Sequence, residues 1–210
     1  MDDHPIIREG MTHLLNLQED LHVCCAAGSA EEALAAMNRQ PGMGRPEMAI
    51  VDISLQSDSG LELVKTLRHR YPDLAILVLS MHDESLFAER ALRAGANGYL
   101  MKLEATEHVM SAIREVLAGN IYVSAAMHEK LARALTVPHK KPEGPIGSLS
   151  EREFEILHLI GLGFSTREIA EKLKRSVKTI EAHQANIKEK LNIRNSKELM
   201  RFAIQWIESQ

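Results

Sequence analysis

The sequence predicts an α/β domain built on a doubly wound parallel sheet, followed by a smaller all-α domain of the helix-turn-helix kind. Three short apolar runs in the first half each end on a polar residue, and helical patterns separate them. Buried parallel strands have such near-continuous apolar runs, and the helices between them cover both faces of the sheet. The second half instead shows closely spaced helix starts and a cationic helix.

The three apolar runs each deliver one polar side chain to the same edge of the predicted sheet. Ligands bind at the carboxyl edge of parallel sheets. Together with the acid pair Asp2-Asp3, this edge gathers acids, a hydroxyl and an ammonium, a set that suits metal-assisted phosphoryl transfer to a carboxylate. The runs and the residues that end them are Met48–Val51 with Asp52, Leu74–Leu79 with Ser80, and Gly98–Met101 with Lys102.

Helical periodicity and helix-start signals predict the other elements of the first domain. A further short strand is expected over residues 21–27, so the predicted order is one helix followed by four strand-helix units. Helices are expected over residues 5–17, 29–40, 61–71, 83–94 and 109–119.

Composition favours a cytoplasmic protein without a membrane span. The chain has 210 residues, 45% of them hydrophobic, yet no run reaches the ~18 apolar residues of a spanning helix, and the start lacks a signal segment. The neighbouring cysteines Cys24 and Cys25 lie in an apolar run, which disfavours a mutual disulfide. Residues 1–144 carry 14 Lys and Arg against 20 Asp and Glu, whereas residues 145–210 carry 11 against 9. This asymmetry fits a metal-binding module joined to a nucleic-acid module.

Residues 1–120 resemble a bacterial response-regulator receiver domain. The matching residues are Asp2-Asp3-His4-Pro5, Asp52, Ser80 and Gly98–Lys102. The resemblance implies a flavodoxin-like, five-stranded parallel sheet in which Asp52 accepts a phosphoryl group from a sensor histidine kinase. It also implies that Mg²⁺ is held by Asp2, Asp3, Asp52 and the backbone carbonyl of Ser54.

Three further residues take roles from this resemblance. Lys102 would offset the new negative charge, Ser80 would hydrogen-bond a phosphoryl oxygen, and Tyr99 resembles an aromatic switch that changes its burial. Taken singly, an acid, serine or lysine after a strand is more often a turn former or a solvated residue. Agreement at three strand ends favours the functional interpretation for Asp52 and Lys102, whereas Tyr99 taken alone is more often a packed edge residue than a switch, and that interpretation stays open.

The sequence departs from the receiver pattern in two places. Only Met1 precedes the acid pair, where receivers usually have an apolar strand. The strands at 21–27 and before Asp52 would therefore each have an unpaired edge, and each buried, unpaired backbone group costs ~1–3 kcal/mol. We hypothesise that the recorded chain starts late: upstream codons for a Val/Ile/Leu-rich segment would support this, and a stop codon there would exclude it. If the chain is this short, we expect a frayed Asp2-Asp3 end. The second departure, Leu55-Gln56 in place of Met-Pro, predicts a more mobile loop.

A linker separates the two predicted domains. Ser124–Leu135 has helical periodicity, and the following twelve residues, 136–147, contain three prolines, two glycines and two lysines. We expect a receiver domain over 1–120, a linker helix and flexible linker over 121–147, and a helix-turn-helix domain over 148–210.

Three helix starts mark the second domain. Ser150 with Glu153 and Ser165 with Glu168 form capping-box patterns, and Ser176 opens a third helix expected to bury Val177, Ile180, Ile187 and Leu191. The region resembles the LuxR-type output domain, which implies that this third helix enters the major groove of double-stranded DNA. The matching segments are Leu149–Glu153, Ser165–Ala170 and Thr179–His183 through Lys190-Leu191.

Residue types in the third helix suggest graded roles at DNA. Cations and hydroxyls suit phosphates, whereas Glu181 could read a cytosine amino group or, with equal weight, be a solvated acid. The last helix carries the apolar residues Leu199, Phe202 and Trp206, which either pack on their own domain or join two copies. The candidate DNA contacts are Ser176, Lys178, Thr179, Glu181, Ala182, His183, Ala185, Lys188 and Lys190.

The sequence thus predicts a two-component response regulator rather than an enzyme: a phosphorylated receiver controls a homodimeric, DNA-binding transcription regulator. The expected partners are a sensor histidine kinase, DNA and a second copy, with RNA polymerase a further candidate. One alternative is a phosphorylation-independent DNA-binding regulator with a degenerate receiver. Another is a phosphatase of the haloacid-dehalogenase class, but that class needs an acid where Ser54 stands.

Overall fold

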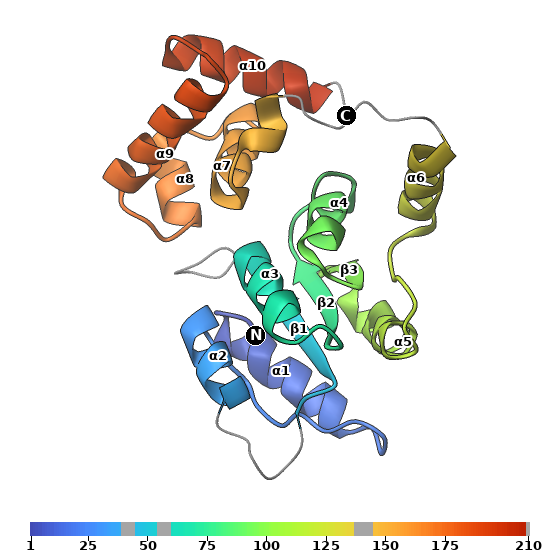
Figure 1. The fold of residues 1–210 in the computed structure, drawn as a ribbon. Helices are drawn as coiled ribbons and strands as arrows, with labels where there is room; N and C mark the ends of the chain where they lie inside the picture. Colours follow the sequence, from blue (N-terminus) through green and yellow to red (C-terminus); the bar gives the residue numbers. More distant parts are fainter. Residues whose placement is uncertain (39–44, 54–59, 137–144, 209–210) are drawn as a thin grey trace. The chain divides into compact units, whose positions relative to one another are not determined.

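The computed structural model describes residues 1–38, 45–53, 60–136 and 145–208 (Figure 1). The chain forms two compact units, Met1–Lys130 and Leu131–Gln210. In the ranges given, no helix is both long enough and apolar enough to cross a membrane.

A three-stranded parallel sheet organises the first unit. Its strands are β1 (Met48–Asp52), β2 (Ala75–Ser80) and β3 (Gly98–Met101), in the order β1-β2-β3. The three strands predicted from the apolar runs are therefore confirmed. In the register, Asp52 lies opposite Leu79 and Ser80 lies opposite Met101, so the strand ends meet at one edge.

Helices cover both faces of this sheet. The helices α1 (Pro5–Asn16) and α5 (Ala105–Leu117) share one apolar core with β2 and β3, which includes Leu15, Leu77 and Ile113. On the opposite face, α3 (Gly60–Arg70) packs against α4 (Glu84–Ala94), and α4 packs against β3. Two further helices, α2 (Ala30–Asn38) and α6 (Ala125–Thr136), complete the helices of residues 1–136.

The chain chemistry explains where these helices begin and end. Pro5 stands in the first turn of α1, where its missing N–H costs nothing. The Asp83 carboxylate caps α4 by accepting from the Ser85 N–H, and Gly95 ends that helix at φ +106°, a conformation that favours glycine. The predicted start of α2 is also seen, because the Ser29 hydroxyl accepts from the Glu32 N–H at 3.2 Å.

The strand predicted over residues 21–27 is wrong, so the described sheet has three strands rather than the four expected of a chain that lacks the first receiver strand. Residues 21–27 are irregular in the structure. Among the described residues, Met1 alone bonds to this edge of β1: its amino group donates to the Ile50 carbonyl at 2.9 Å, and its carbonyl accepts from the Asp52 N–H at 3.0 Å. A strand needs a neighbour over several residues, and a single rung cannot supply one. At the other edge of the sheet, Tyr122 makes an isolated bridge to Gly98.

The expected unpaired edge of β1 is seen in part, because Met1 is the one described residue that pairs with that side of the strand. The Ala75 N–H of β2 donates to the Glu47 carbonyl. Because backbone hydrogen-bonding groups alternate along a strand, the N–H and C=O groups of the even-numbered residues of β1 point away from β2. That side borders a groove of about 450 Å³, lined by residues of α1, β1 and the segment 20–26. Cys24 and Cys25 also line the groove without forming a disulfide, and burial raises the pKa of Cys25 to about 11.

The expected fraying of the Asp2-Asp3 end is wrong. Besides the two hydrogen bonds of Met1, the Asp2 N–H donates to the Ala27 carbonyl at 3.1 Å, and an Arg8 Nη1 donates to the Asp2 carbonyl at 2.6 Å. The two bonds from Met1 to β1 and the two bonds from the Asp2 backbone therefore hold the acid pair in place.

The second unit contains a 3₁₀ turn (Pro145–Ser148) and the helices α7 (Glu151–Gly161), α8 (Thr166–Lys172), α9 (Val177–Lys190) and α10 (Ser196–Glu208). Both predicted capping boxes are confirmed, at Ser150 with Glu153 and at Ser165 with Glu168.

The core of the second unit lies between α7, α8, α9 and α10. Ile180 and Ile187 of α9 are fully buried in it, as predicted. The predicted burial of Val177 is wrong: this side chain stands in the first turn of α9 and is 40% exposed. Gly161 gives α10 room, because a Cβ there would lie 2.6 Å from the Ala203 carbonyl oxygen.

Candidate functional site

Polar side chains converge at the carboxyl edge of the sheet. Lys102 follows β3, and its Nζ lies 2.6 Å from Asp52 Oδ2 and 2.7 Å from Asp2 Oδ2. The backbone sets these positions, since the Lys102 N–H donates to the Ser80 carbonyl at 2.7 Å and the Asp52 N–H donates to the Met1 carbonyl. The structure thus brings together three of the residues singled out in the sequence.

Charge holds this cluster together. Asp52 is 1% exposed and Asp2 is 5% exposed, so two carboxylates lie in a place poor in water. Burial alone would lower the pKa of Lys102, but the charge of Asp52 and the hydrogen bonds with both acids outweigh burial and raise that pKa. Lys102 therefore remains an ammonium and offsets part of the carboxylate charge.

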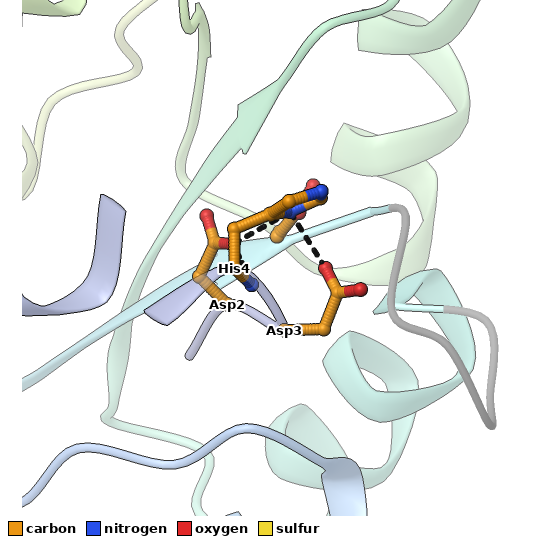
Figure 2. A group of neighbouring side chains, drawn as sticks. Asp2, Asp3 and His4 are labelled. Carbon is orange, nitrogen blue, oxygen red and sulfur yellow. Dashed lines mark hydrogen bonds and ion pairs between the residues drawn. The ribbon is translucent and has the colours of Figure 1, made fainter. Parts of the chain in front are cut away.

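Asp3 and His4 complete the cluster on the other side of Asp2 (Figure 2). His4 Nδ1 lies 2.9 Å from Asp3 Oδ1 and 3.2 Å from Asp2 Oδ1. Asp2, Asp3, His4 and Asp52 each offer a ligand atom, and these atoms all lie within 4.8 Å of one another. Buried carboxylate oxygens at this spacing fit a hard divalent cation. Sequence reasoning did not assign His4 to the site because its spacing matched no standard ligand motif.

Ser80 and Tyr99 meet at the backbone of His82. The Ser80 Oγ accepts from the His82 N–H at 3.0 Å, and the Tyr99 hydroxyl donates to the His82 carbonyl at 2.9 Å. Both side chains are buried, and burial raises the pKa of Tyr99. The His82 ring in turn stacks on Phe87 of α4, with ring centroids 4.4 Å apart. Tyr99 thus packs inward, and its switch role stays a prediction.

The predicted role of Ser54 and the predicted mobility of the Leu55-Gln56 loop concern residues 54–59, which lie outside the described residues. Both therefore stay predictions. Gly60, the next described residue, contacts the backbone of Asp52 so closely that a Cβ at Gly60 would lie 2.0 Å from the Asp52 carbonyl oxygen.

The helix α9 presents a polar face in the second unit. Its first turn is capped by Ser176, whose Oγ accepts from the Thr179 N–H at 3.1 Å and lies 2.8 Å from the Thr179 hydroxyl. These two hydroxyls therefore stabilise the start of α9, in addition to their predicted contact with DNA phosphates. Of the other predicted DNA contacts, His183 and Lys188 are half-buried, and the exposed ones are Lys178, Glu181, Ala182, Ala185 and Lys190.

Lys190 differs from the other cations of α9. Its Nζ lies 2.6 Å from Glu153 Oε2, and the Glu153 side chain is 4% exposed. Burial alone would raise the pKa of Glu153, but the hydrogen bonds from Lys190 and Ser150 outweigh it and lower that pKa. Lys190 therefore joins α9 to α7, and its assignment to a DNA phosphate stays a prediction. The 37-residue separation of this pair leaves no local sequence signal.

The apolar stripe of α10 faces its own domain in part. Leu199 is 2% exposed and lies in the core, which favours packing on its own domain; its assignment to the dimer contact stays a prediction. Trp206 is half-buried and packs edge-on against Phe154, with ring centroids 5.2 Å apart. Phe202 is also half-buried. The exposed large apolar side chains of α10 are Met200 and Ile204.

Two family models match the chain. Residues 1–114 match the response regulator receiver domain, and residues 147–203 match the bacterial regulatory proteins of the luxR family. The first match covers the sheet and the acid cluster, and the second covers α7, α8, α9 and most of α10.

The chain is also similar to whole proteins and solved structures. It is 35% identical to the oxygen regulatory protein NreC of Staphylococcus carnosus (strain TM300), over 97% of this chain and 94% of that protein. It is 25% identical to RcsB of Salmonella enterica serovar Typhimurium, solved bound to promoter rprA with the phosphomimetic BeF3⁻, at a TM-score of 0.58 over 96% and 95% of the two chains. A LuxR-family two-component response regulator from Aurantimonas sp. SI85-9A1 is 30% identical at a TM-score of 0.56, over 65% of this chain and 94% of that one. The chain therefore belongs to the two-component response regulators of the NarL/LuxR type, DNA-binding transcription regulators with a receiver domain and a LuxR-type helix-turn-helix domain.

Proposed function

We propose that Asp52 accepts a phosphoryl group from a sensor histidine kinase and that this modification controls DNA binding by the second unit. The observation that carries the proposal is the Lys102 ammonium, which lies between the buried carboxylates of Asp52 and Asp2. A carboxylate on a strand end, with a cation already in contact, suits a nucleophile that becomes a dianionic acyl phosphate, which carries about one negative charge more than the carboxylate. The alternative of a degenerate receiver is less favoured, because Lys102 contacts both Asp2 and Asp52.

Asp2, Asp3 and Asp52 would hold Mg²⁺ at this edge, and the ion would offset charge on the phosphoryl oxygens. An Asp52 carboxylate oxygen attacks phosphorus, the bond from phosphorus to the kinase histidine breaks, and Asp52 becomes an acyl phosphate. Lys102 is close enough to move from Asp52 Oδ2 to a phosphoryl oxygen, and the Ser80 hydroxyl can donate its own proton to another.

Ser80, His82 and Tyr99 offer a route from this site to the surface of α4. If Ser80 turns toward the phosphoryl group, its hydrogen bond from the His82 N–H is lost. The same backbone accepts from Tyr99, and the His82 ring stacks on Phe87 of α4. We propose that phosphorylation selects a second arrangement of these groups and changes the surface around α4.

The second unit is proposed to bind double-stranded DNA as a homodimer. RcsB, which is 26% identical to this chain at a TM-score of 0.53, has been solved as two dimers bound to two parallel DNAs. In this chain we assign DNA contact to the exposed face of α9 and the two-fold contact to α10, through Met200 and Ile204 beside Phe202 and Trp206. The proposed α9 contacts are Ser176, Lys178, Thr179, Glu181, Ala182, His183, Ala185, Lys188 and Lys190.

We propose that this protein changes transcription in the cytoplasm and that RNA polymerase is a further partner. It is proposed to turn over no small-molecule substrate. In the decisive experiment, the full chain is incubated with Mg²⁺ and acetyl phosphate, and its mass is measured by intact-protein mass spectrometry. We expect an adduct of about 80 Da that is lost in Asp52→Asn. DNA affinity, measured by anisotropy with a duplex selected from a random pool, should rise with the adduct in the wild type only. An adduct that persists in Asp52→Asn would refute the assignment.

A further inference from the structure

His4 occupies a fixed position beside the proposed metal site. Its backbone N–H donates to Asp2 Oδ1 at 2.9 Å, and the next residue, Pro5, begins α1. The turn and the proline ring restrict the backbone on both sides of His4. As Figure 2 shows, its imidazole lies over Asp2 and Asp3. The ring nitrogen Nδ1 is thus presented to both acids by the backbone of the segment.

The spacing of these atoms matches that of neighbouring ligands around one ion. Two ligands at right angles, each ~2.1 Å from an octahedral cation, are about 3 Å apart. His4 Nδ1 lies 2.9 Å from Asp3 Oδ1 and 3.2 Å from Asp2 Oδ1. Lys102 instead contacts the other oxygen of Asp2, Oδ2, and Asp52 Oδ2. The imidazole and the ammonium therefore use different oxygens of Asp2.

We propose that His4 Nδ1 is a ligand of the same metal as the carboxylates and that the site consequently prefers Mn²⁺ to Mg²⁺. This inference rests on the metal site proposed above and adds a specificity-determining residue to it. Imidazole nitrogen is a good ligand for first-row transition ions, whereas Mg²⁺ takes oxygen ligands almost exclusively. A set of one imidazole and three carboxylates is therefore better matched to Mn²⁺ than an all-oxygen set is.

A competing interpretation makes His4 only a charge partner of Asp2 and Asp3. The two interpretations predict opposite effects when the ring is removed. A charge partner competes with any cation, so its loss would strengthen Mn²⁺ and Mg²⁺ binding by the same factor. A ligand contributes a bond that Mn²⁺ uses and Mg²⁺ does not, so its loss would weaken Mn²⁺ binding and leave Mg²⁺ binding nearly unchanged.

The test titrates the full, unphosphorylated chain with MnCl₂ and, separately, with MgCl₂ at pH 7.5 by calorimetry. The variants are His4→Gln and, as a matched control, His13→Gln, which removes an exposed histidine of α1. We expect wild type and His13→Gln to bind Mn²⁺ more tightly than Mg²⁺. In His4→Gln we expect this preference to shrink about tenfold, through weaker Mn²⁺ binding. Circular dichroism verifies that each variant is folded.

Pulsed electron paramagnetic resonance of the Mn²⁺-loaded chain gives a second readout that does not depend on affinity. Directly bound imidazole nitrogen should give a ¹⁴N coupling in the wild type and in His13→Gln, and this coupling should be absent from His4→Gln. An unchanged ratio of the two affinities in His4→Gln, or no ¹⁴N coupling in the wild type, would overturn the proposal while leaving the Mg²⁺ site intact. Failure of the wild type to bind either ion would refute the metal site itself, and His4 as its ligand with it.

Discussion

The Nζ of Lys190 and the Oε2 of Glu153 lie 2.6 Å apart, and this ion pair joins the end of α9 to the start of α7. Glu153 also accepts from the Ser150 N–H at 2.7 Å, so one buried carboxylate both caps α7 and holds α9. The orientation of the helix proposed to contact DNA thus depends on a residue of another helix.

Lys190→Ala should destabilise the second unit by about 1–2 kcal/mol, a value reduced for the exposure of the lysine. The chain has a single tryptophan, Trp206, and it packs in this unit, so its fluorescence during urea unfolding reports on the unit by itself. Lys178→Ala, at an exposed position of the same helix, is the control and should change stability by less than about 0.5 kcal/mol. Equal effects of the two substitutions would contradict the structural role of Lys190.

Acid should weaken the second unit through the same pair. Because the pKa of Glu153 is lowered in the folded state, its contribution to stability is full above the ordinary value of 4.5 and is lost as pH falls through the lowered value. Urea unfolding followed by Trp206 fluorescence at pH 6 and pH 3 should therefore show a larger loss of stability in wild type than in Glu153→Gln. Parallel losses in the two proteins would show that Glu153 does not cause the effect.

Lys102→Gln should leave the carboxylates of Asp2 and Asp52 without their ammonium and lower the stability of the first unit by about 3 kcal/mol at pH 7. A divalent cation can take over the lost charge, so we expect Mg²⁺ to raise the melting temperature of Lys102→Gln more than that of wild type. Thermal melts by circular dichroism with and without Mg²⁺ provide the measurement. The double variant Lys102→Gln/Asp52→Asn, with one acid fewer, should recover part of the loss.

Gly60→Ala should disturb the phosphoacceptor strand, because the added Cβ would meet the Asp52 carbonyl oxygen at 2.0 Å. We expect a loss of about 1–3 kcal/mol and a slower gain of the phosphoryl adduct. Gly10→Ala is the matched control, since a Cβ there meets nothing within 4 Å, and alanine should stabilise α1 by up to about 1 kcal/mol. A Gly60→Ala variant as stable as wild type would mean that α3 can shift away from Asp52.

Ile204→Glu should weaken dimerisation without unfolding the second unit, because this side chain is 37% exposed on α10. Analytical ultracentrifugation of the phosphorylated chain, with Trp206 fluorescence as the folding check, should show more monomer than wild type at the same concentration. Glu208→Gln, near the end of the same helix, serves as the control and should leave the monomer fraction unchanged. A dimer that persists in Ile204→Glu would place the two-fold contact elsewhere.

The parts of the fold that the sequence predicted correctly are those set by local pattern. The three strands were identifiable because each is an apolar run that ends on a polar residue, and α7 and α8 because a capping box involves residues only three apart. The segment 21–27 has the same apolar pattern but forms no strand. Among the described residues, Met1 alone bonds to the nearby edge of β1, so this segment has no adjacent strand to pair with. Strand formation there depends on a partner, which local pattern does not reveal.

The site was predictable where each strand end contributed one residue. Asp52 and Lys102 are adjacent because parallel strands in register end at one edge. The ligand position of His4 and the ion pair of Lys190 were missed for a different reason. Each depends on how a turn or a helix is oriented in space, and residue types along the chain do not encode that orientation.

The groove beside β1 also bears on how the protein behaves in concentrated solution. The Met48 and Ile50 N–H groups point toward it, and beyond Met1 no described residue pairs with that side of the strand. A row of backbone donors and acceptors at a sheet margin is a template for cross-β contact between molecules. Turbidity of the 210-residue chain should therefore grow with protein concentration.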